Sequence, residues 1–171
     1  VKFFCSILII FSTSFIGYIL AFRYTRRIQQ LKDLYLSFQL LETEILFLSN
    51  SLPIAMKRVG QKSNPIIGEF FMNTYRILSQ KTGCSIEEAW NQSLHDNFLN
   101  TSLTKDDIEV LTDFGKNLGA TDKENQLKNF KFIYLQLEKQ QKAAENLKNK
   151  NAKMCKSLGA LVGITIVILL I

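Results

Sequence analysis

Few side chains of this sequence could do acid–base chemistry, and their spacing does not indicate a catalytic site. His95 is the single histidine and stands beside Asp96. An imidazole next to a carboxylate can serve as a general base near neutral pH, but a lone histidine of this kind on a helix is usually a surface residue. We therefore predict no catalytic role for His95.

Adjacent carboxylates occur at Glu87–Glu88 and at Asp106–Asp107. Both pairs fall where a helix is expected to begin, and the helix dipole favours negative charge there, so a structural role accounts for them. The three cysteines are far apart and form neither a C-x-x-C pair nor a metal-ligand spacing. The sequence contains no phosphate-binding loop and no common hydrolase or metalloprotease motif. We predict that the chain is not an enzyme and holds no cofactor or metal.

Both ends of the chain are apolar. Residues 3–22 run for twenty residues without a charge, the length that a helix needs to cross about 30 Å of hydrocarbon. Residues 158–171 number only 14, so this segment spans only if Met154 joins it and Lys156 extends toward the lipid headgroups. We predict transmembrane helices at 1–22 and at 158–171.

A cleaved signal peptide is the alternative for the first segment. Its apolar run is long for that role, no convincing cleavage site follows it, and Arg23, Arg26 and Arg27 come directly after it. By the positive-inside rule these arginines, and the lysines before the second segment, stay in the cytoplasm. Residues 23–157 would then form one cytoplasmic helical domain.

The net charge of +6 is unevenly distributed. Residues 23–32 carry four basic and no acidic groups, and residues 139–156 carry six lysines and one glutamate, whereas residues 33–138 carry 14 acidic and ten basic groups. Basic residues beside a span favour anionic lipid headgroups. Nucleic-acid binding would require a basic patch on the domain itself. We expect membrane lipids, and no nucleic acid, as partners.

Glycine is sparse and the apolar residues recur at helical spacing, which predicts an all-α fold. We expect an antiparallel bundle of about six helices, whose first and last members continue into the two spans. Start and stop residues mark the helices: one over 23–48, one ending near Gly60, one from Asn64 to Gly83, and three beginning at Ser85, Thr104 and Thr121 with an acidic residue three positions later. Trp90 is expected in the core.

Small residues lie on one face of each predicted span. Gly17 and Ala21 share a face of the first, and Gly159 and Gly163 form a G-x-x-x-G pattern in the second. Such faces allow transmembrane helices to approach closely. We predict span packing at these four residues, within one chain or between chains.

Several segments together resemble the stage III sporulation protein AB family. They are Leu41-Glu42-Thr43-Glu44-Ile45, Phe114-Gly115, Leu118-Gly119, Asp122 and Gln126, Lys153-Met154 and Leu158-Gly159, followed by the apolar end of the chain. The family is similar to the helical cytoplasmic domains of the inner-membrane platform protein of type II secretion and type IV pilus systems.

The resemblance implies a non-enzymatic membrane component of the channel between mother cell and forespore, in the mother-cell membrane around the forespore. It implies as partners a cytoplasmic secretion-type ATPase and the other channel subunits encoded with it. Platform proteins usually carry two such domains and more spans, so a homo-oligomer is expected here.

For partner docking we single out four residues of the resembling segments. Glu42 and Glu44 are expected to reach solvent, and Asp122 and Gln126 precede or open the last helix. The alternative is that Asp122 supports the cap of that helix and Gln126 bonds a neighbouring loop. A membrane-tethered sensor, or a module that binds a peptide or small ligand in a groove, remains the competing function; a sizeable apolar cavity would favour it.

Overall fold

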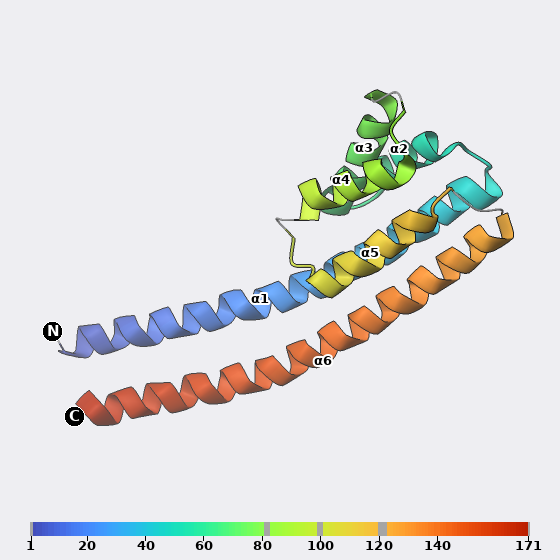
Figure 1. Ribbon diagram of the computed structural model, residues 1–171. Coiled ribbons are helices and arrows are strands. Elements are labelled where there is room, and N and C mark those ends of the chain that lie inside the picture. Colours follow the sequence, from blue (N-terminus) through green and yellow to red (C-terminus); the bar gives the residue numbers. More distant parts are fainter. Residues whose placement is uncertain (1, 81–82, 99–100, 120–122, 171) are drawn as a thin grey trace. The chain divides into compact units, whose positions relative to one another are not determined.

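The structure is a computed structural model that describes residues 2–80, 83–98, 101–119 and 123–170. Within these ranges, side chains are described from residue 22 to residue 151. No strand occurs among them, and the all-α prediction with about six helices is confirmed (Figure 1). The helices are α1 (Lys2–Glu42), the π-helix η1 (Thr43–Phe47), α2 (Leu52–Lys62), α3 (Pro65–Gln80), α4 (Ile86–Phe98), α5 (Lys105–Asn117) and α6 (Lys123–Leu170).

The chain divides into two units. One consists of Val1–Ile28 and Lys142–Ile171, and the other, which we call the body, is Gln29–Gln141. The predicted spans at 1–22 and 158–171, with Gly17, Ala21, Gly159 and Gly163, lie outside the residues whose side chains are described. Judged on the described residues, no helix has both the length and the apolar character needed to cross a membrane.

Local capping explains where two helices of the body begin. The amide of Glu88 donates to Ser85 Oγ at 3.1 Å, and the amide of Ser85 donates to Glu88 Oε2 at 3.1 Å. Thr104 and Asp107 form the same reciprocal pair at the start of α5. Each pair satisfies two backbone donors that a helix end would otherwise leave open. Two of the three predicted helix starts, at Ser85 and Thr104, are confirmed, whereas the third, at Thr121, lies outside the described residues.

The second helix ends at Lys62, two residues past the predicted end near Gly60, so Gly60 itself lies within the helix and does not stop it. Gly60 is needed for packing instead. A Cβ on Gly60 would lie 2.9 Å from the carbonyl oxygen of Gly68, and a Cβ on Gly68 would lie 2.5 Å from the carbonyl oxygen of Gly60. The two glycines therefore let α2 and α3 cross with their backbones almost in contact, and tertiary packing overrides the usual tendency of glycine to end a helix.

An aromatic cluster fills the centre of the body. Trp90 is fully buried, as predicted, and its ring centroid lies 4.6 Å from that of Phe70 and 5.8 Å from that of Phe114. Its indole Nε1 donates to the carbonyl of Leu111 at 2.9 Å, so the polar edge of the ring is satisfied. A Cβ on Gly115 would overlap this ring, with Trp90 Nε1 at 2.6 Å. Glycine at 115 thus makes room for the tryptophan.

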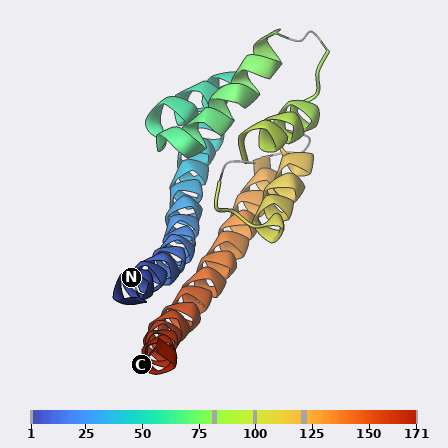
Figure 2. The same cartoon turned by 90° about the vertical axis from the view of Figure 1, so that its left-hand side faces the viewer.

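Within the body, α1 and α6 run side by side in opposite directions (Figures 1 and 2). The rings of Tyr35 and Tyr134 lie 5.0 Å apart, and the hydroxyl of Tyr134 donates to Glu42 Oε2 at 2.6 Å. Partial burial and the neighbouring Glu42 carboxylate both raise the pKa of the Tyr134 phenol. This bond ties the last helix to the end of the first.

Candidate docking surface around the π-helix

The end of α1 widens into a single π-helical segment, Thr43–Phe47. The amide of Leu48 donates to the carbonyl of Thr43 at 3.0 Å, five residues back, and Ser49 follows in the left-handed region with a φ of 51°. Single π-turns inside helices are rare and often occur at functional sites. The wider turn also changes which side chains face the core.

Because of that change, the apolar side chains at the end of the helix point in other directions than they would in a continuous α-helix. The helical spacing of the apolar residues over 23–48 predicts that Leu48 faces inward with Leu41 and Ile45, and this is wrong: Leu48 is 55% exposed, while Leu46 is buried. Phe47 is 76% exposed, the most exposed of the large apolar side chains described. The π-turn therefore presents Phe47 and Leu48 to solvent.

Glu44 was expected to reach solvent, and this too is wrong. Its carboxylate is buried and accepts hydrogen bonds from Asn50 Nδ2 at 2.7 Å and Arg58 Nη1 at 3.2 Å, with Lys62 Nζ at 3.5 Å. Burial alone would raise the pKa of Glu44, but the bond from Asn50 and the positive charges of Arg58 and Lys62 outweigh it and hold the pKa below its usual value. Glu44 thus anchors the π-turn to α2.

Of the other three predicted docking residues, two form intramolecular contacts and one lies outside the described residues. Glu42 is half-buried and accepts the bond from Tyr134. Gln126 is buried, and its Nε2 donates to the carbonyl of Asn117 at 3.0 Å, the bond to a neighbouring segment that was the alternative to docking. Asp122 lies outside the described residues. The docking role of these residues stays a prediction.

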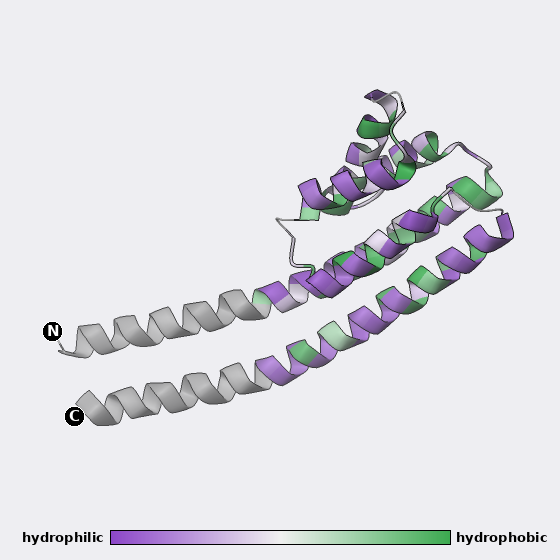
Figure 3. Cartoon of the chain, viewed as in Figure 1, coloured by the Kyte–Doolittle hydropathy of each residue, from purple (hydrophilic) through white to green (hydrophobic). Residues whose placement is uncertain are grey.

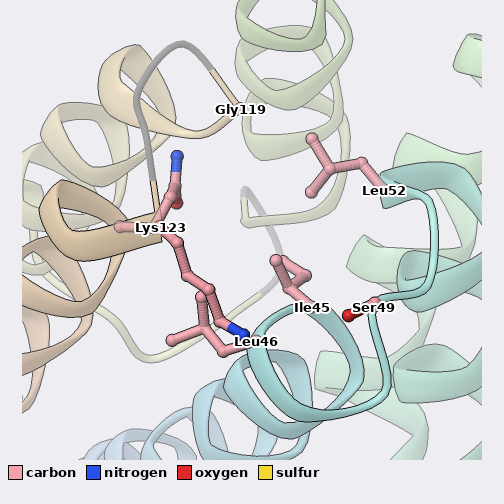
Figure 4. A pocket seen from close by; sticks show the side chains of 7 residues that line it. Ile45, Leu46, Ser49, Leu52, Gly119 and Lys123 are labelled. Carbon is pink, nitrogen blue, oxygen red and sulfur yellow. The ribbon is translucent and has the colours of Figure 1, made fainter.

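Two depressions lie beside the π-turn. The first, of about 240 Å³, is lined by residues of η1, the following turn and the start of α6 (Figure 4): Ile45, Leu46, Ser49, Leu52, Gly119, Lys123 and Gln126. The second, of about 450 Å³, is lined by Leu46, Phe47, Lys123, Glu124 and Leu127. They share Leu46 and Lys123, so we treat them, with exposed Leu48, as one surface and call it the π-turn surface.

Gly119 shapes one wall of this surface. Its φ of +77° is a conformation that other residues rarely adopt. A Cβ there would also lie 2.6 Å from Leu52 Cδ1 and 2.8 Å from Ile86 Cδ1. Both the backbone conformation and the available space require glycine at this position.

Three segments that carry the family resemblance meet at this surface. Ile45 comes from the first of them, Gly119 from the pair before α6, and Gln126 from the first turns of α6. The residues singled out from the sequence belong to segments that line this surface, but Phe47, Leu48 and Lys123 were not among them. The uninterrupted apolar run Ile45-Leu46-Phe47-Leu48 before Ser49 was the available signal, because no single helix face can bury four successive residues.

Residues that could act in acid–base catalysis or bind a metal lie elsewhere. The imidazole of His95 is 78% exposed, with Nδ1 3.5 Å from Asp96 Oδ1. Among the described residues, no group of three or more His, Cys, Asp or Glu side chains is placed to hold a metal ion. The concave surface at the π-turn is therefore the candidate site, and its lining suits protein contacts.

Comparisons with known proteins identify relatives of this chain. The sequence profile of the family described as stage III sporulation protein AB matches residues 2–171. Stage III sporulation protein AB of Bacillus subtilis (strain 168) is 33% identical over 165 residues, which cover 96% of each chain. A solved structure of a stage III sporulation protein AB superposes with a TM-score of 0.68 at 29% identity, over 73% of this chain and 98% of that one. These matches place the role of the chain in sporulation, because the chain belongs to the stage III sporulation protein AB family.

Proposed function

We propose that the chain is a non-enzymatic membrane platform component of a secretion-like channel between mother cell and forespore, and that the π-turn surface docks a cytoplasmic secretion-type ATPase. The observation that carries this proposal is the meeting of three family segments at one exposed, concave, apolar surface. Solvent-exposed apolar side chains grouped around depressions are typical of protein interaction sites. Phe47 supplies the aromatic anchor that such interfaces commonly use.

The position of the surface within the body fits a docking role. It lies where α1 ends and α6 begins, which is the end of the body opposite to Gln29 and Gln141. The chain leaves the body through those two residues toward the basic and apolar terminal segments. The π-turn surface is formed by the body alone and contains no residue of the terminal segments.

A ligand-binding module fits the structure less well. The centre of the body is filled by aromatic rings, and both depressions open to solvent. Small-molecule sites usually enclose most of the ligand surface. Shallow depressions beside an exposed phenylalanine suit the side chains of a partner protein better.

Substitution of the anchor tests the ATPase proposal. In a sporulating strain that carries the variant gene in place of the native one, Phe47→Ser is expected to abolish recovery of the secretion-type ATPase with the membrane fraction and to reduce spore yield. Leu36→Ser is the matched control, since Leu36 is also exposed on the body, at 58%, but outside the π-turn surface. Undiminished ATPase recovery with Phe47→Ser would refute the docking role.

Membrane insertion needs a separate measurement. We expect the full chain to stay in the pellet on extraction of membranes with alkaline carbonate, and a protease added to inside-out vesicles to cleave the body and spare the terminal segments. Release of the full chain by carbonate would contradict the two spans without bearing on the docking surface.

A further inference from the structure

A second exposed surface lies on α6, beyond the part of α6 that lines the π-turn surface. Phe132 is 55% exposed and Leu135 is 65% exposed, although both belong to the body. They are three residues apart, so they neighbour each other on the helix. Figure 3 shows the rest of α6 in the body as largely hydrophilic with scattered apolar turns.

Lysines mark both ends of this apolar pair. Lys128 precedes Phe132 by four residues and Lys139 follows Leu135 by four, so the four side chains form one row along the helix. Lys128 pairs with Glu124 at 2.9 Å, an exposed contact that is worth at most about 0.5 kcal/mol and is easily exchanged. Within the described part of the chain, no carboxylate pairs with Lys139. Glu138 is exposed but lies in the row of Tyr134, to one side.

We propose that this row, Lys128-Phe132-Leu135-Lys139, binds an acidic amphipathic helix of another protein. The complementary helix carries two apolar residues spaced by three, with a carboxylate four residues outside each of them. Its apolar pair packs on Phe132 and Leu135, and its carboxylates meet the two ammonium groups.

Charge decides against a second copy of the chain as the occupant. In an antiparallel pairing centred between Phe132 and Leu135, Lys128 of one copy would face Lys139 of the other at both ends. In a parallel pairing each lysine would face its own counterpart. Either arrangement places like charges together at the edge of the contact, which is unfavourable.

A lipid surface fits less well than a helix. Adsorption of a helix to a membrane scales with the apolar area that it buries and normally uses a continuous apolar face. Here the apolar part of the row is two side chains, Phe132 and Leu135.

The test uses the full chain in nanodiscs of zwitterionic lipid and a fluorescent synthetic helix with glutamates and leucines at the complementary spacing. A twin peptide with lysines in place of the glutamates is the control. We expect the acidic peptide to bind at least about tenfold more tightly than its twin, with the difference shrinking at high salt. Equal affinity for the two peptides would overturn the proposal.

Variants of the chain identify the surface. Lys128→Glu with Lys139→Glu is expected to reverse the preference between the two peptides, and Phe132→Gln with Leu135→Gln to weaken binding of both. Lys57→Glu with Lys105→Glu makes the same change in charge elsewhere on the body and should leave the preference intact. Reversal by this control pair would mean that net charge alone is responsible, and the proposal would fall.

Two further outcomes separate the competing occupants. Loss of peptide binding when phosphatidylserine is added to the nanodiscs would assign the row to lipid and refute the proposal. Retention of peptide binding by Phe47→Ser is expected, because Phe47 lies on the π-turn surface. This retention also keeps the proposal independent of ATPase docking.

Discussion

Gly115→Ala offers the sharpest test of how the core of the body is built. The added methyl group would lie 2.6 Å from Trp90 Nε1 and closer still to Cδ1, well inside van der Waals contact. The indole cannot retreat easily, because Phe38, Phe70 and Phe114 surround it and its N–H is bonded to Leu111. The ring or α5 has to move, and both are held by packing.

The size of the effect follows from three contributions. Overpacking a tight core costs about 1–3 kcal/mol, and displacement of the indole from its acceptor costs a further ~1–2 kcal/mol. Alanine in place of glycine inside a helix returns about 0.5–1 kcal/mol. We therefore expect Gly115→Ala to lower the free energy of unfolding by about 1–4.5 kcal/mol, or to lower the midpoint of thermal unfolding by roughly 3–14 °C.

A double-mutant cycle isolates the contact. Trp90→Phe removes Nε1, one of the ring atoms that the new methyl group would strike, together with the hydrogen bond to Leu111 that its displacement would break. Gly115→Ala in that background should therefore cost about 1 kcal/mol less than in the native background. Thermal unfolding followed by far-ultraviolet circular dichroism of the chain in mild detergent measures all four proteins. If Gly115→Ala is neutral in the native background, or equally costly beside Phe at position 90, the steric explanation is refuted.

Three further predictions concern the ends of the helices. Glu44→Gln should lower the free energy of unfolding by about 1–2 kcal/mol near pH 7. Because folding lowers the pKa of Glu44, its carboxylate stabilises the fold above the unfolded pKa, and this stabilisation disappears as the pH falls through the folded pKa. The free energies of unfolding of the variant and the native chain, measured across pH, should therefore converge in acid. Tyr134→Phe should lower the free energy of unfolding by about 1 kcal/mol at neutral pH, because the hydrogen bond to Glu42 is lost. Since folding raises the pKa of this phenol, the native chain, but not the variant, should lose that stability above about pH 10. A difference in the free energy of unfolding between native chain and variant that is constant at all pH values would contradict the role of this hydrogen bond. Phe47→Ser should change the free energy of unfolding by less than about 0.5 kcal/mol, because Phe47 is exposed. A large loss of stability would show that Phe47 is a core residue.

Much of the fold could be predicted because its signals are local. The boxes at Ser85 and Thr104 depend on residues three positions apart, and the inward stripe from Leu31 to Leu41 depends on helical period alone. These features require no knowledge of distant segments. Trp90 was placed in the core by the same reasoning, and it is fully buried.

The site was harder to predict because distant segments decide it. The π-turn depends on Glu44 reaching Arg58 and Lys62 of α2, and this contact turns the carboxylate inward and Leu48 outward. Gly60 stays helical because Gly68 of the next helix lies against it. Neither contact leaves a periodic trace in the sequence, so a continuous α-helix and a glycine stop were the reasonable expectations.

The burial of Trp90 has a practical consequence for studying this chain. It is the single tryptophan, and it lies among rings contributed by α1, α3 and α5. Its fluorescence should be shifted to the blue in the native state and should move to the red only when these helices separate. The π-turn surface and the lysine row on α6 contain no tryptophan, so intrinsic emission can verify that a surface variant is folded while a labelled partner reports binding in a separate spectral window.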